Sequence, residues 1–92
     1  MIEPAIRLFE DIERKRRELD YIDDADTAQK SANVTAEQIR DDLDGADLMI
    51  QERRFPELYD AAVGIAGKSV RLAAVARQGM IQTKGGEHGK TD

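Results

Sequence analysis

Residues 56–82 are apolar around most of the circumference that they would have as a helix, and this feature most constrains the fold. One face of that helix carries residues spaced three or four apart: Leu58, Ala62, Ile65, Leu72 and Ala76. An adjoining face carries a second set: Val63, Ala66, Val70 and Ala74. A helix that is apolar on several sides must be buried on several sides. We therefore expect copies of this chain to associate, with the first face as the interface.

Two more helices are predicted before this one. Residues 4–22 open on Pro4, which suits a first helical turn. Their stripe repeats every three or four residues: Ala5, Leu8, Ile12, Lys15, Leu19 and Ile22. Thr35 and Gln38 have the spacing of a capping box, which predicts that the second helix begins at Thr35. Ile39, Leu43, Ala46 and Ile50 would line one face of that helix, with Met49 beside them. Residues 23–33 have no large apolar side chain, so they could extend a helix or connect two.

These patterns predict an all-α fold, a small three-helix bundle that homo-oligomerisation completes. A chain of 92 residues has room for one domain, which we place at residues 1–82, with a flexible tail over residues 83–92. Pro56 marks the start of the third helix. Glycines inside the predicted helices include Gly45, Gly64 and Gly67. Each costs about 1 kcal/mol relative to alanine, and close approach of a neighbouring helix would explain them.

The composition argues against an enzyme. There is no cysteine, and the one histidine, His88, lies in a glycine-rich segment, so thiol chemistry and histidine-based triads are not expected. The acidic residues lack the spacing of a calcium loop. No apolar run reaches the roughly 20 residues that cross a bilayer, and charges interrupt residues 1–20, unlike a secretory leader. We expect a cytoplasmic protein with no metal, cofactor or membrane contact.

Residues 62–69 read AVGIAGKS, a relaxed phosphate-loop pattern with alanine at the first glycine. A phosphate loop follows a buried strand, whereas FPELYD precedes this segment. We therefore predict that residues 62–69 are part of a helix built from small side chains.

Residues 34–43 read VTAEQIRDDL. This run resembles the turn and recognition helix of some bacterial winged-helix repressors, and the resemblance implies a DNA-binding segment over residues 34–54. Its candidate phosphate or base contacts are Arg40, Arg53 and Arg54. Glu37, Asp41 and Asp44 on the same helix would repel phosphates, and the net charge of −5 disfavours nucleic acid as a partner.

A basic cluster in the first helix is the candidate surface for a protein partner: Arg14, Lys15, Arg16 and Arg17. Glutamates three or four residues away can neutralise it: Glu10 for Arg14, and Glu13 for Arg16 and Arg17. The leading interpretation is a non-enzymatic protein that acts by protein–protein association, as an adaptor, accessory protein or inhibitor, including the kinds that phages and mobile elements carry. The alternatives are a DNA-binding regulator or packaging subunit, and an oligomer that sequesters an anionic nucleotide with Arg16, Arg17 or Lys68.

Overall fold

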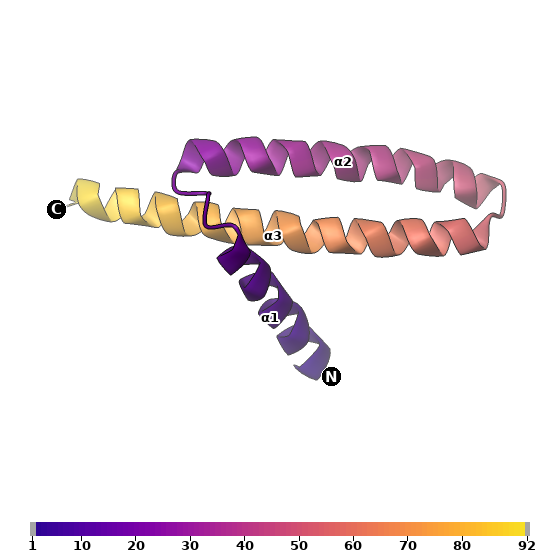
Figure 1. Ribbon diagram of the computed structural model, residues 1–92, viewed down its shortest axis with the longest axis horizontal. Coiled ribbons are helices and arrows are strands. Elements are labelled where there is room, and N and C mark those ends of the chain that lie inside the picture. The colour runs from indigo at the N-terminus through magenta and orange to yellow at the C-terminus, as the bar shows by residue number, and fades with distance from the viewer. Residues whose placement is uncertain (1, 92) are drawn as a thin grey trace.

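The computed structural model describes residues 2–91, and side chains for residues 4–83. It contains α1 (Ile2–Glu18), α2 (Ala25–Gln51) and α3 (Phe55–Thr91), and residues 2–91 include no strand. Helices α2 and α3 form a long antiparallel hairpin, while α1 meets the middle of α3 and points away from the hairpin (Figure 1). The all-α, three-helix prediction is confirmed. The predicted tail, residues 83–92, lies outside the described side chains except for Thr83, so its flexibility stays a prediction.

The molecule is elongated, with extents of 58 × 31 × 20 Å and a radius of gyration of 16.2 Å. A compact chain of this length would have a radius of about 12 Å. The long axis follows from α3, since 37 helical residues span about 55 Å at 1.5 Å each. In addition, α1 packs on α3 and not on α2, so the described helices do not close into a bundle. The predicted bundle is therefore incomplete within one chain.

Helix α1 ends at Glu18, four residues before the predicted end at Ile22. Leu19 and Ile22 lie in the connection to α2, and both are buried. Two short-range bonds bend the chain there: the Leu19 N–H donates to Arg16 O, and the Ile22 N–H donates to Leu19 O, both at 3.0 Å. Spacing alone could not show this end, because Leu19 and Ile22 keep the helical stripe pattern while packing from a turn.

Helix α2 begins ten residues earlier than the capping box predicted. Asp24 is its N-cap, with an extended backbone and a carboxylate that accepts the Thr27 N–H at 2.7 Å. The open question over residues 23–33 is resolved, since residues 25–33 are helical. The start predicted at Thr35 is wrong, because Thr35 is buried inside the helix and its hydroxyl donates to Ser31 O at 2.9 Å.

The α2–α3 seam has the three-and-four spacing of a coiled coil. On α2 it comprises Ala28, Thr35, Ile39, Asp42, Ala46 and Met49, and on α3 it comprises Leu58, Ala61, Ile65, Lys68, Leu72, Val75 and Gly79, all buried or half-buried. The Lys68 Nζ lies 2.5 Å from Asp42 Oδ2 across the seam. A polar pair at one seam position opposes sliding of the helices, because a slip would strand both charges against apolar neighbours. The predicted α2 stripe is wrong at Leu43 and Ile50, which are exposed.

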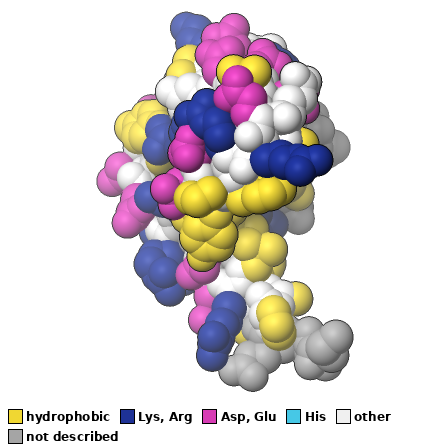
Figure 2. Space-filling view, turned by 90° about the vertical axis from the view of Figure 1, so that its right-hand side faces the viewer, with side chains coloured by type: hydrophobic (Ala, Val, Ile, Leu, Met, Phe, Trp, Pro, Cys, Tyr) yellow, Lys and Arg dark blue, Asp and Glu magenta, His cyan; other side chains and the backbone are white. Residues whose placement is uncertain are grey.

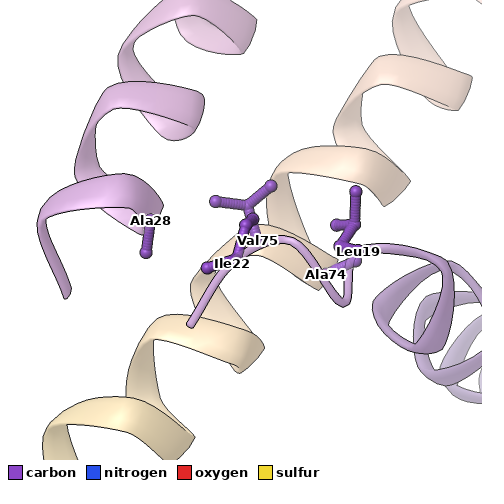
Figure 3. Close-up of a cluster of buried hydrophobic side chains, with 5 residues drawn as sticks. All are labelled: Leu19, Ile22, Ala28, Ala74 and Val75. Atoms are coloured by element: carbon purple, nitrogen blue, oxygen red, sulfur yellow. The ribbon is translucent and has the colours of Figure 1, made fainter. Parts of the chain in front are cut away.

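The hydrophobic core is small and lies where the three segments meet. Its buried members come from the α1–α2 connection, α2 and α3: Leu19, Ile22, Ala28, Ala74 and Val75 (Figure 3). The Gln78 side-chain amide donates to Ile22 O at 3.0 Å and ties the connection to α3. Apolar side chains elsewhere on α3 are exposed, among them Tyr59, Val63 and Met80, and their burial by a second copy stays a prediction.

The close approach expected at Gly45, Gly64 and Gly67 is not found within the chain, since a Cβ there would meet no atom within 4 Å. Gly79 is the tight position, where a Cβ would lie 3.2 Å from the Cβ of Ala28.

A tight turn joins α2 to α3. The Arg53 N–H donates to Ile50 O at 3.2 Å, and the Arg54 N–H donates to Met49 O at 2.8 Å, which is the Schellman pattern. Arg53 has a φ of 57°, the left-handed conformation that this motif requires. The predicted boundary at Pro56 is confirmed to within one residue, because α3 begins at Phe55.

Candidate functional site

The crossing of α1 and α3 is held by apolar and polar contacts. Ile12 packs against the core beside Leu19. The Glu13 carboxylate forms ion pairs with two arginines. Its Oε2 lies 3.0 Å from Arg16 Nε and 3.6 Å from Arg77 Nε. The Arg16 Nη1 also lies 3.4 Å from Gln78 Oε1. These polar contacts reach α3 at Arg77 and Gln78, and α1 residues also line a cavity with Gly67 and Val70.

The apolar stripes of both helices continue past this crossing and lose their cover. On α3, the positions towards its start form an open α3 face, namely Phe55, Tyr59 and Val63, which are 60%, 72% and 56% exposed. On α1, the positions towards its start form an α1 arm, namely Ile6, Leu8 and Phe9, which are 49%, 51% and 59% exposed. We call these six residues the association surface.

A cavity of about 470 Å³ lies between α1 and α3 at their crossing. It is lined by charged α1 residues and by Gly67 and Val70 of α3. Figure 2 views the molecule from the end at which α3 begins, and hydrophobic side chains gather there between the charged top of the hairpin and α1. An apolar surface of this kind, rimmed by charges, is typical of a protein–protein contact.

Sequence reasoning missed Phe55 and Tyr59 as interface candidates. Val63 was placed on the face adjoining the predicted interface, and Tyr59 and Phe55 precede it at steps of four residues. Extending that face towards the helix start would have found them.

The residues predicted as the oligomer interface do not share one surface. Leu58, Ile65 and Leu72 are half-buried in the α2–α3 seam, whereas Ala62 and Ala76 are exposed. The division arises because α3 serves two partners within the chain, α2 along one stripe and α1 along another. On the adjoining face, Val63 and Ala66 are exposed, whereas Val70 is half-buried and Ala74 is buried.

The basic cluster of α1 is largely neutralised within its own helix. Arg14 pairs with Asp11 at 3.0 Å rather than with the predicted Glu10. Lys15 pairs with Glu18 at 2.9 Å, and the predicted pair Arg16–Glu13 is confirmed. Arg17 is exposed and does not pair with Glu13. The cluster is thus spread around α1, and its role in partner binding stays a prediction.

The residues proposed for DNA or nucleotide contact are also dispersed. Helix α2 is continuous through residues 34–36, so the turn implied by the repressor resemblance is absent. Arg40 is exposed on α2, Arg53 lies in the turn, and Arg54 pairs with Glu52 at 3.1 Å and with Glu57. For a nucleotide, Lys68 faces Asp42 while Arg16 faces Glu13, so these cations lie in separate contacts.

Residues 62–69 are helical, as predicted for the phosphate-loop-like segment. Among the described residues, no group of three metal-ligating side chains is close enough to hold a metal ion. None of the helices, over their described residues, combines the length and the apolar content of a membrane span.

Comparison with known proteins finds no family model that matches this chain, no similar curated protein and no similar solved structure. Function must therefore be inferred from the association surface and from the cavities.

Proposed function

We propose that this protein is non-enzymatic and acts by association, with self-association through the association surface as its first step. The observation that carries this proposal is the balance of apolar side chains in a single chain. Among the side chains of residues 4–83, six hydrophobic residues are buried, and four of them are smaller than leucine: Ala28, Ala46, Ala74 and Val75. Larger side chains such as Phe9, Phe55 and Tyr59 remain exposed. A second copy would give them the cover that the chain itself lacks.

The area fits a dimer. A large apolar side chain presents about 200 Å², and the six residues of the association surface are each about half to three-quarters exposed. They therefore offer at most roughly 700 Å² per chain, compared with the about 800 Å² that each partner contributes to a standard interface. Covering all six requires contacts on more than one side of α1, because residues two apart on a helix, such as Ile6 and Leu8, do not share a face.

The two halves of the surface both lie on helices, so they can pack side by side. At 1.5 Å per residue, the α1 arm spans about 5 Å from Ile6 to Phe9, and the open α3 face spans about 12 Å from Phe55 to Val63. The α1 arm of one chain can lie on the open α3 face of another, and a two-fold axis makes the exchange reciprocal. The result is a closed bundle in which both stripes stay buried along their length.

The test is the molar mass in solution, measured by light scattering coupled to size exclusion, for wild type and Tyr59→Glu. Wild type is expected to be a dimer or larger at about 100 µM, a concentration that populates even micromolar complexes. A buried glutamate at the centre of the open α3 face should dissociate it. Leu43→Glu is the matched control, because Leu43 is exposed on α2, outside the surface.

Three results decide the matter, with circular dichroism verifying that each variant stays helical. A monomeric wild type refutes self-association. A dimer that Leu43→Glu dissociates and Tyr59→Glu does not refutes this surface but keeps self-association. A dimer that only Tyr59→Glu dissociates supports both parts of the proposal.

A further inference from the structure

A second cavity, of about 550 Å³, lies where the α1–α2 connection meets α2 and α3. Its volume falls within the range of small-molecule sites. Lys30 from α2 and Arg71 from α3 bring two positive charges to it. Hydroxyl groups of Tyr21, Thr27 and Ser31 line the same space, and Val34 adds an exposed apolar wall.

The cavity has an unusual charge for this chain. None of the residues that line it is acidic, although the chain carries 19 acidic and 14 basic residues. Four basic residues are half-buried in the described part of the chain, and three of them lie within 4.0 Å of a carboxylate: Lys15, Arg16 and Lys68. The fourth is Arg71, whose hydrogen bond goes to the Tyr21 hydroxyl instead. A guanidinium that is partly removed from water is usually paired with an anion. The positive charge of Arg71 is therefore available to a bound anion.

The groups around Arg71 are held in place by hydrogen bonds. The Arg71 Nη2 donates to Tyr21 Oη at 3.1 Å, and Tyr21 Oη lies 3.3 Å from Ser31 Oγ. These two hydrogen bonds join the α1–α2 connection, α2 and α3 at one point. The other guanidinium N–H groups of Arg71 remain available to a ligand. Lys30 is exposed at the rim of the same cavity.

We propose that this cavity binds a small molecule through an oxyanion, either a phosphate monoester or a carboxylate. Arg71 and Lys30 hold the charged group, because charge-assisted hydrogen bonds to such oxygens are the strongest available here. The Ser31 and Thr27 hydroxyls donate to the remaining oxygens, and Val34 contacts the apolar part of the ligand. The site is built within one chain, so it does not depend on the proposed self-association.

The test follows backbone amide and arginine Nε–H resonances by NMR during titration at constant ionic strength. Inorganic phosphate, phenyl phosphate and acetate serve as separate probes, to distinguish a phosphate ligand from a carboxylate ligand. We expect saturable shifts at Arg71 and at residues 27–34, with phenyl phosphate binding more tightly than inorganic phosphate. Arg71→Gln should weaken binding about tenfold or more, the loss of one charge-assisted contact.

Arg40→Gln is the matched control, since it removes the same charge from an exposed α2 position outside the cavity. It should leave the affinity unchanged. If Arg71→Gln is not folded, Lys30→Gln takes its place, because Lys30 is exposed and its loss spares the packing. The proposal is overturned if no probe gives saturable shifts by about 20 mM, or if Arg40→Gln weakens binding as much as the cavity variants do.

Discussion

Gly45 and Gly79 lie in the interiors of α2 and α3, and they make opposite predictions for the same substitution. Alanine favours a helix over glycine by about 1 kcal/mol. At Gly45 the new Cβ meets nothing within 4 Å, so Gly45→Ala should raise the free energy of unfolding by about 1 kcal/mol. For a domain of this size, that corresponds to a rise in Tm of about 4–8 °C.

At Gly79 the same gain in helix stability is opposed by a close contact. The new Cβ would lie 3.2 Å from the Cβ of Ala28, a buried residue on the facing helix that cannot turn aside. Overpacking of a core typically costs about 1–3 kcal/mol. Gly79→Ala is therefore expected to be neutral or destabilising.

Urea unfolding followed by circular dichroism measures both effects, with the protein concentration held constant because association would shift the midpoint. A double variant isolates the contact: in an Ala28→Gly background, Gly79→Ala should recover its gain of about 1 kcal/mol. If Gly79→Ala alone stabilises the protein as much as Gly45→Ala does, the close packing of α2 on α3 at this point is refuted.

Two further predictions concern the ends of α2. Arg53 adopts a left-handed conformation, which costs a residue with a side chain about 1 kcal/mol. Arg53→Gly should therefore raise the free energy of unfolding by up to that amount. Unchanged or lower stability in urea would contradict the assigned turn. The pKa of Asp24 lies below its ordinary value of 3.8, chiefly because its carboxylate accepts the Thr27 N–H. The stabilisation of the folded state by the Asp24 carboxylate is thus complete above the unfolded pKa of about 4. It is lost as the pH falls through the lower pKa of the folded state. Asp24→Ala should lower Tm at pH 7 and approach wild type at about pH 2, and a Tm difference independent of pH would contradict this assignment.

The fold class could be predicted from local patterns because helices leave a periodic signature in the chain. The spacing of apolar residues in 4–18 and 56–82 identifies α1 and α3 without any tertiary information. Pro56 locates the start of α3 because a proline restricts the backbone of its own residue and of the one before it.

Helix boundaries and packing faces depended on contacts between segments. Leu19 and Ile22 fit a continued helix equally well, yet they pack against α3 from a turn. Thr35 fits an N-cap by its spacing to Gln38, but it is buried within α2, and Asp24 takes the cap. Only the position of α3 distinguishes these outcomes, since the local patterns are compatible with both.

By itself, then, the sequence determined that the chain forms three amphipathic or broadly apolar helices. The tertiary structure decided which stripe of α3 faces α2, which faces α1 and which stays open, because two helices compete for the circumference of a third. It also brought Lys30 and Arg71 to one cavity although they are far apart in the sequence. Periodicity assigns a residue to a face of its own helix, but only packing between helices assigns that face a neighbour.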